Sequence, residues 1–157
     1  MDKSTVTANV RFAVLADVTS LVALLQQLFS LEFDFAGDPE KQRHGLRLLL
    51  GNPQAIVVVV TVGKQVLGMC SGQLLISTAE GGYSVLVEDV VVLPEWRGKG
   101  IGRALLAAVA DWAEERGATR LQLLADRNNA HAFGFYRQLG WQTTELVCLM
   151  RQDLSGR

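Results

Sequence analysis

A length of 157 residues fits one domain spanning 1–157, and 15 basic against 16 acidic side chains leave a net charge of −1. This balance excludes a general electrostatic attraction to nucleic acid or to an anionic membrane, so an anionic ligand must be held locally. Two cysteines and two histidines without zinc-type spacing exclude a zinc site, and we expect no metal.

The first third of the chain predicts one strand and two helices. Residues 9–14 favour a strand, and Asp17 is expected to cap the helix that follows. The apolar positions of that helix recur at helical spacing: Leu21, Leu24, Leu25 and Leu28. Residues 29–39 predict a loop. Asp38 and Pro39 then resemble an N-cap and a first helical residue, opening a second helix to position 50.

The middle of the chain predicts three strands and a long helix. The β-branched run 55–62 suits a buried strand, and 65–77 and 83–93 follow as further strands, each after a glycine-containing turn. Residues 100–116 carry an apolar stripe at helical spacing, and Gly117 stands where a helix is commonly terminated.

The last part predicts a strand at 120–124, a helix at 129–139, and a closing strand or hairpin at 141–150. The order is therefore β-αα-βββ-α-β-α-β. Adjacent antiparallel strands come first, and strand–helix–strand units that favour parallel pairing follow. We expect an α/β fold with a mixed sheet flanked by helices.

Three alternating glycines, Gly98, Gly100 and Gly102, lie between the strand 83–93 and the helix 100–116. Such glycines let backbone N–H groups turn toward one point, and the following helix adds the partial positive charge of its N-terminus. Three cations lie among them: Arg97, Lys99 and Arg103. The segment predicts a phosphate site, although a glycine-rich turn with solvated charges is the plain alternative.

Two familiar phosphate motifs do not fit this turn. A dinucleotide-binding fingerprint needs glycine where Arg103 stands, and a P-loop needs a Ser or Thr after Gly-Lys, where Gly100 stands. Both motifs are excluded by residue identity.

Residues 97–102, Arg-Gly-Lys-Gly-Ile-Gly, resemble the R/Q-x-x-G-x-G/A motif of the GNAT superfamily of acetyl-CoA-dependent N-acetyltransferases. The resemblance implies the GNAT fold and backbone amides that bind the pyrophosphate of coenzyme A. It also implies that Val90 and Val92, with Val91 between them, contact the pantetheine arm. The cofactor residues implied by the turn are Arg97, Gly98, Lys99, Gly100, Ile101, Gly102 and Arg103, with Arg127 as a further candidate cation.

A second segment, 129–141, is similar to the family pattern N-x-x-A-x-x-F-Y-x-x-x-G-F, with Trp141 in place of the last Phe. The resemblance implies that Tyr136 lies beside the thioester sulfur and gives its proton to the departing thiolate. An aromatic core role is the alternative for Tyr136. Asn129 is expected either to contact the pantetheine or to cap the helix.

The reaction implied is direct attack of a primary amine on the thioester in a ternary complex. A primary amine with a pKa near 10.4 is mostly protonated at pH 7, so a base is useful. Strand alternation places Glu88 on the face of Val90 and Val92, and Asp89 on the opposite face. We expect Glu88 to act as the base or to position water; Asp89 and a structural role for both are the alternatives.

The loop after the first helix alternates aromatic and acidic residues. Phe29, Glu32 and Asp34 could form a slot for a cationic amine such as an amino sugar, a polyamine or a protein N-terminus. The plain alternative is a helix end with solvated acids.

The function expected is therefore N-acetyl transfer with acetyl-CoA as cosubstrate, from an enzyme without metal, nucleic-acid partner or membrane contact. A non-catalytic acetyl-CoA sensor and a transferase of longer acyl groups are the alternatives. Cys70 and Cys148 lie in apolar stretches, which indicates buried free thiols in a reducing compartment. With no signal-peptide core, this predicts a cytoplasmic protein. The apolar run 146–150 predicts either core packing or a homodimer interface.

Overall fold

The computed structural model describes residues 7–30 and 37–155. They form two compact units, Met1–Leu123 and Leu124–Arg157. No helix among the described residues is long and apolar enough to cross a membrane. The expectation of a single domain over 1–157 stays a prediction.

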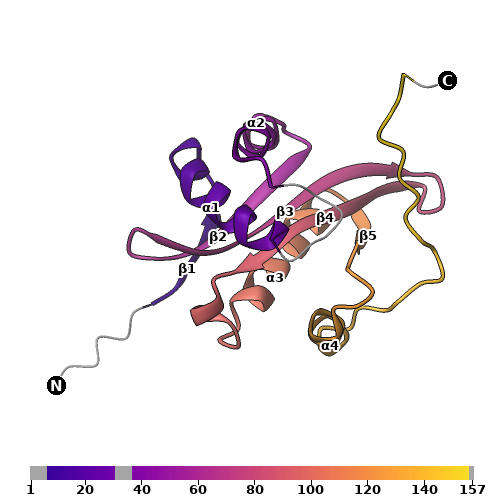
Figure 1. Ribbon diagram of the computed structural model, residues 1–157. Helices are drawn as coiled ribbons and strands as arrows, with labels where there is room; N and C mark the ends of the chain where they lie inside the picture. Colours follow the sequence, from indigo (N-terminus) through magenta and orange to yellow (C-terminus); the bar gives the residue numbers. More distant parts are fainter. Residues whose placement is uncertain (1–6, 31–36, 156–157) are drawn as a thin grey trace. The chain divides into compact units, whose positions relative to one another are not determined.

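The first unit contains a five-stranded sheet with the order β1-β2-β3-β4-β5 (Figure 1). Its strands are β1 (Asn9–Phe12), β2 (Ala55–Val62), β3 (Gln65–Ser77), β4 (Gly82–Val92) and β5 (Ala118–Leu123). The first four strands pair antiparallel, and β5 pairs parallel to β4. The mixed sheet expected from the order of elements is confirmed.

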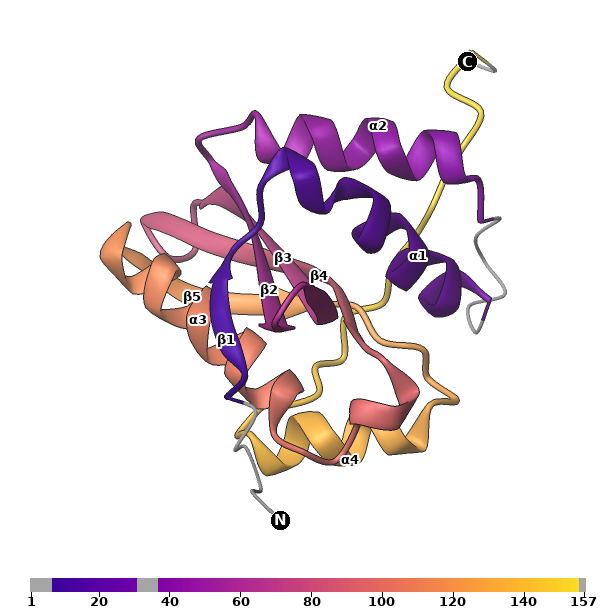
Figure 2. The same ribbon diagram turned by 90° about the vertical axis from the view of Figure 1, so that its left-hand side faces the viewer.

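Helices cover both faces of this sheet. The helices α1 (Val18–Phe29) and α2 (Pro39–Leu50) lie together over one face (Figure 2), and α3 (Ile101–Glu115) packs on the other. Neighbouring residues of β3 show the division. Met69 belongs to the core cluster formed with α1 and α2, whereas a side chain at Gly68 would meet Ile101 and Leu105 of α3.

The burial of the middle strands explains why their bounds could be predicted from apolar and β-branched residues. The residues Ile56–Val60 of β2 are all buried, with exposed fractions of 5% or less. A strand covered by helices on both faces needs apolar residues at consecutive positions, and β-branched side chains suit that setting. The predicted bounds 55–62 and 65–77 are those of β2 and β3.

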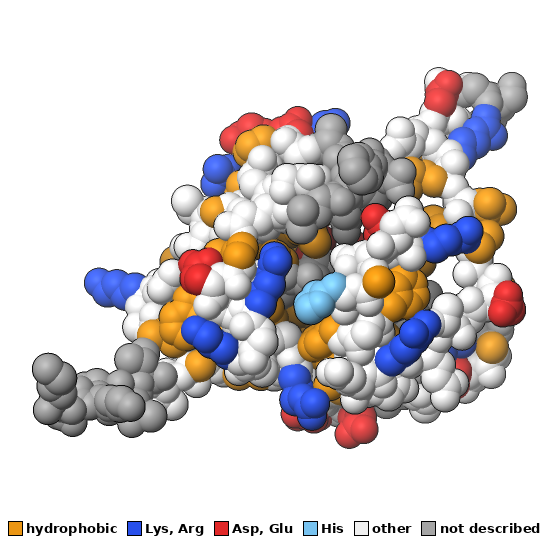
Figure 3. Space-filling view, turned by 60° about the horizontal axis from the view of Figure 1, so that its bottom comes forward, with side chains coloured by type: hydrophobic (Ala, Val, Ile, Leu, Met, Phe, Trp, Pro, Cys, Tyr) orange, Lys and Arg blue, Asp and Glu red, His pale blue; other side chains and the backbone are white. Residues whose placement is uncertain are grey.

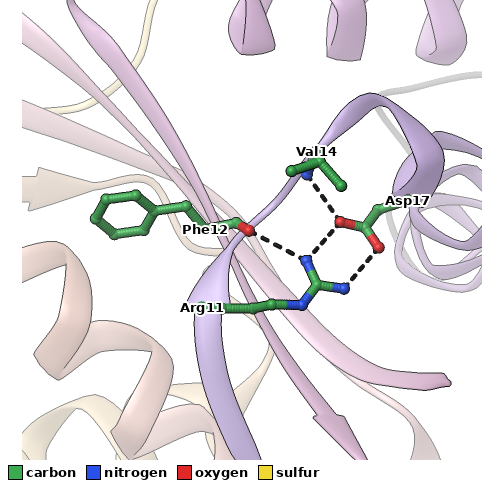
Figure 4. A network of polar contacts seen from close by, with 4 residues as sticks. All are labelled: Arg11, Phe12, Val14 and Asp17. Atoms are coloured by element: carbon green, nitrogen blue, oxygen red, sulfur yellow. Dashed lines mark hydrogen bonds and ion pairs between the residues drawn. The ribbon is translucent and has the colours of Figure 1, made fainter. Parts of the chain in front are cut away.

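The junction between β1 and α1 differs from the expectation in one respect. Helix α1 begins directly after Asp17, but the Asp17 side chain makes no capping bond to it. Its carboxylate instead accepts two hydrogen bonds from the Arg11 guanidinium, at 2.7 and 2.8 Å, and one from the Val14 N–H at 2.8 Å (Figure 4). Asp17 is the N-cap residue of α1 as predicted, but its side chain does not cap the helix, because Arg11 and the Val14 N–H donate to the carboxylate.

The start of α2 follows the prediction. The Asp38 carboxylate accepts hydrogen bonds from the N–H groups of Glu40 and Lys41, at 2.9 and 3.3 Å, and Pro39 is the first helical residue. Proline is favoured there because the N–H that it lacks would have no partner within the helix.

The second unit contains α4 (Ala130–Gln138). The closing strand or hairpin predicted at 141–150 is absent from the described residues, so this prediction is wrong. Leu146 and Leu149 are 88% and 92% exposed. A strand forms only where a neighbouring strand pairs with its backbone groups, and α4 offers no such edge.

Candidate active site

A β-bulge interrupts β4 just before the glycine-rich turn. Met69 pairs with Val91 and Ser71 pairs with Glu88, so one residue of β3 opposes two residues of β4, Asp89 and Val90. Asp89 has a φ of 56° and is the one non-glycine residue with positive φ among those described. Aspartate is among the few side chains that tolerate this left-handed conformation. The Ser71 hydroxyl donates to the Glu88 carbonyl at 3.1 Å, which ties the bulge to β3.

The extra residue changes which side chains share a face. Val91, not Val90, packs in the core cluster beneath α1 and α2, while Val92 pairs with Gly68 on the face toward α3. The prediction that Glu88 shares a face with Val90 and Val92 is therefore wrong, because a bulge shifts the alternation by one residue. A consequence is that Glu88 and Asp89 line the same cavity instead of opposite faces.

This cavity has a volume of about 440 Å³, within the range of small-molecule sites. It lies between the helices α1 and α2 and the bulged part of β4. The apolar lining residues come from the two helices: Leu25, Phe29, Leu46, Leu48 and Leu49. The other lining residues are Asp38, Lys41, Gln42, Gly45, Asn52, Gln73, Glu88 and Asp89. Three carboxylates against one ammonium favour a cationic ligand.

Of the predicted acceptor residues, Phe29 lines the cavity. Glu32 and Asp34 lie outside the described residues, so their role stays a prediction. Sequence reasoning assigned no site residue to α2, although this helix supplies much of the wall. Its signal was the recurrence of Lys41, Gly45 and Leu48 on one helical face, which a search for catalytic residue types passes over.

Cys70 is the residue of β3 opposite the bulge, and it does not line the cavity. Burial raises the pKa of its thiol to about 12, and the nearby Asp89 carboxylate adds to the rise. The thiol therefore stays protonated and is not a nucleophile near neutral pH. Both cysteines are free as expected, but Cys148 is exposed, so its predicted burial is wrong.

The glycine-rich turn follows β4 directly and needs glycine for its conformation. Gly98 and Gly100 have φ values of 71° and 81°, and a Cβ at either position would meet no described atom within 4 Å. Backbone conformation, and not crowding, therefore requires glycine. Gly100 is the N-cap of α3, and its carbonyl accepts the first intrahelical bond, from the Ala104 N–H at 3.0 Å.

The first N–H groups of α3 are the main-chain donors of this turn. The leading N–H groups of any helix lack acceptors within it, and the aligned peptide dipoles give this end a partial positive charge. Gly102 lies in the first turn of α3, where a missing side chain lets a ligand approach the backbone. The geometry suits a phosphate group.

The three cations of the turn have different surroundings. The Arg97 Nε donates to the Val92 carbonyl at 3.1 Å, which holds the turn against the end of β4. The Lys99 ammonium lies 4.6 Å from the centre of the Trp96 ring, and Arg103 is exposed on the first turn of α3. Figure 3 shows Lys and Arg side chains at several places on one face of the molecule, with Asp and Glu side chains among them.

Next to the turn, β4 pairs with β3 on one side and has no pairing strand among the described residues on the other. β5 pairs with β4 only as far as Val87 and Leu123. The Leu93 N–H donates to the Leu67 carbonyl of β3 at 2.8 Å, so the backbone groups of Val92 point to the opposite edge, where the Val92 carbonyl accepts the Arg97 Nε. Among the described residues, this edge has no partner strand beyond Val87 and could pair with an extended ligand.

Tyr136, Asn129 and Arg127 belong to the second unit. The Asn129 carboxamide caps α4 by accepting the Ala132 N–H at 3.0 Å, the capping alternative for this residue. The Tyr136 ring lies 5.2 Å from Phe135 and 5.7 Å from Trp141, measured between ring centres. Both ring contacts belong to the alternative of an aromatic core role, and the catalytic role of Tyr136 stays a prediction.

Comparisons with known proteins match most of the chain. Residues 21–141 match the acetyltransferase (GNAT) family. Streptothricin acetyltransferase of Streptomyces lavendulae is 40% identical over 74 residues, which are 47% of this chain and 39% of that protein. The chain therefore spans less than half of this relative.

Solved structures show the same fold. An aminoglycoside N-acetyltransferase in complex with CoA superposes with a TM-score of 0.85 at 17% identity, over 98% of this chain and 99% of that one. An acetyltransferase from Clostridium acetobutylicum, solved with acetyl-CoA, gives 0.78 at 18% identity, over 92% and 96% of the two chains. At these identities the likeness shows the fold alone.

Proposed function

The chain belongs to the GNAT family of acetyltransferases, and we propose that it transfers the acetyl group of acetyl-CoA to a primary amine by direct attack. The observation that carries this proposal is the order of three features within 16 residues, 88–103. A carboxylate at a cavity, an open strand edge and a glycine-rich turn at a helix N-terminus follow one another in the sequence.

The cosubstrate would lie along these three features. The diphosphate would be bound by the N–H groups of the turn from Gly98 to Arg103, and the pantetheine arm would pair with the open edge of β4. The Val92 N–H points to that edge, which supports its proposed role, while the Val92 carbonyl accepts a hydrogen bond from the Arg97 Nε. Two structural relatives were solved with CoA or acetyl-CoA.

The reaction needs two proton movements. The amine nitrogen attacks the thioester carbonyl carbon, a C–N bond forms, and the C–S bond breaks. The attacking nitrogen loses a proton to Glu88, directly or through water, and the leaving thiolate takes one from Tyr136. Glu88 is exposed at the cavity, which keeps it within reach of an acceptor.

The acceptor is expected to be a cationic amine because Asp38, Glu88 and Asp89 outnumber Lys41 on the cavity wall. Two relatives are named for the acetylation of streptothricin and of aminoglycosides, which belong to the same class of acceptor.

The test is amine-dependent release of free CoA together with calorimetric titration of CoA. Micromolar binding with thiol release for at least one amine is the expected result. Binding without release for any amine would favour the sensor alternative, and no binding at all would contradict the proposal. Titration with propionyl-CoA and succinyl-CoA separates acetyl transfer from transfer of longer groups.

Two further points belong to the proposal. The free thiols of Cys70 and Cys148 support a reducing compartment, hence the cytoplasm.

The exposed run 146–150 supports pairing of two copies, since a contiguous exposed apolar segment commonly marks a protein interface.

A further inference from the structure

Neither backbone conformation nor crowding requires glycine at position 45. It lies inside α2, and glycine is among the least favourable residues in a helix interior. It is not among the glycines with positive φ, and a Cβ there would meet no described atom within 4 Å. Gly68 is different, because a Cβ there would come within 2.9 Å of the Val91 carbonyl oxygen.

Gly45 does line the cavity of the candidate active site. Lys41, Leu48 and Leu49 lie one turn away from it along the same face of α2, since residues three and four apart are neighbours on a helix. Leu48 is 61% exposed although its side chain lines the cavity. Leu48 and Leu49 therefore form an apolar surface on one side of the missing side chain, and Lys41 lies on its other side.

The opposite wall has a different chemistry. The bulge in β4 directs Glu88 and Asp89 to the same cavity. A ligand that complements both walls carries a positive charge toward β4 and an apolar body toward Leu48 and Leu49 of α2.

We propose that Gly45 is a specificity-determining residue, and that the acceptor is an amine whose apolar carbon body occupies the space left by its missing side chain. The inference rests on the proposed acetyl transfer and names the acceptor class of that same site. A side chain at this position would fill the space and exclude a bulky acceptor, while a small amine would still reach the carboxylates.

The experiment compares Gly45→Ala and Gly45→Leu with His44→Leu in the full chain. His44 is exposed on α2 and does not line the cavity, so this control adds the same apolar side chain outside it. The probes are 2-phenylethylamine as a bulky apolar amine, ethylamine as a small one, and glucosamine as a polar one. Thiol release, melting temperature and acetyl-CoA affinity are measured for each protein.

We expect the wild-type protein to prefer 2-phenylethylamine to both other probes. Gly45→Leu should lower kcat/KM for 2-phenylethylamine by about tenfold or more and leave ethylamine within about twofold, because added bulk in a pocket discriminates by size. Gly45→Ala should raise the melting temperature by about 2–4 °C, as expected for alanine in a helix of a domain this size. His44→Leu should change neither amine.

An equal loss for both amines in Gly45→Leu, or a preference for glucosamine in the wild type, would overturn the inference. A lower melting temperature for Gly45→Ala would also overturn it, because the glycine would then serve packing. If no amine releases thiol, the proposed function fails, and calorimetric titration of 2-phenylethylamine into the CoA complex decides separately. Binding lost in Gly45→Leu supports the inference, and binding retained there, or absent from the wild type, contradicts it.

Discussion

Glu88 reaches the cavity together with its neighbour because Asp89 accepts a left-handed backbone conformation. At the scale of single residues, the two neighbours Glu88 and Asp89 therefore have different roles. Asp89 is needed for the path of the chain, whereas Glu88 pairs regularly with Ser71 and offers its side chain to a ligand. This difference favours Glu88 as the base.

We expect Glu88→Gln to lower kcat by about 10²–10⁴-fold, the usual contribution of a general base. The affinity for acetyl-CoA should change little, because the turn proposed to bind the phosphates is separate. Steady-state kinetics across pH and calorimetry check this. Glu95→Gln, which alters an exposed acid beside the turn, is the control. A variant with wild-type kcat and an unaltered pH–rate profile would exclude the role.

Tyr136 supplies the second residue-scale prediction. Tyr136→Phe keeps the ring that contacts Phe135 and Trp141 but removes the hydroxyl. We expect kcat to fall by about tenfold or more with little change in melting temperature, since the thiolate then leaves without a proton donor. Tyr83→Phe, at an exposed tyrosine of β4, is the matched control. Unchanged kcat with a lower melting temperature would assign Tyr136 to the core instead.

At the scale of elements, the glycine-rich turn depends on backbone conformation. Gly100→Ala places a Cβ at a φ of 81°, which costs about 1–2 kcal/mol and tilts the first N–H groups of α3. We expect acetyl-CoA affinity to fall by about tenfold. Gly63→Ala in the β2–β3 turn, at a φ of 55°, imposes similar strain away from the site and should keep its affinity. Equal losses in the two variants would point to general destabilisation.

The junction of β1 and α1 gives a pH-dependent prediction. The hydrogen bonds from Arg11 lower the pKa of Asp17, despite its burial, and the Val14 N–H contributes to the same shift. A lowered pKa means that this stabilisation is fully present above the unfolded value near 3.9 and is lost as pH falls through the folded value. Asp17→Asn should therefore lower the free energy of unfolding at pH 7 by about 1–3 kcal/mol.

Urea denaturation of the wild type and Asp17→Asn at pH 7 and pH 3 measures this difference. The gap between them should narrow at the lower pH, because the wild-type carboxylate is then losing its charge. Asp111→Asn, at an exposed acid of α3, should leave stability unchanged at both pH values. A gap that is the same at both would contradict the assignment.

At the scale of the whole molecule, the exposure of the apolar run 146–150 has no explanation in a monomer. Leu146→Glu combined with Leu149→Glu should convert a dimer to a monomer, because charges are depleted at the core of such interfaces. Light scattering after size-exclusion chromatography measures the mass. Gln142→Glu combined with Thr143→Glu, at exposed polar positions nearby, is the control. A monomeric wild-type protein would remove the proposal.

The local signals of the sequence were sufficient for most elements. The β-branched run of β2, the Asp38–Pro39 start of α2 and the left-handed Gly117 after α3 were all predicted, because each depends on nearby residues. The glycine motif also identified the family, since its pattern lies in consecutive residues.

What the tertiary structure decided is which distant groups meet. Asp17 bonds to Arg11 instead of capping α1, the bulge opposite Cys70 brings Glu88 and Asp89 to one cavity, and α2 presents Gly45 to it. The run 146–150 finds no strand partner among the described residues. Helix, strand and turn preferences act over a few residues, whereas carboxylate partners, strand register and cavity walls depend on packing between segments far apart in the chain.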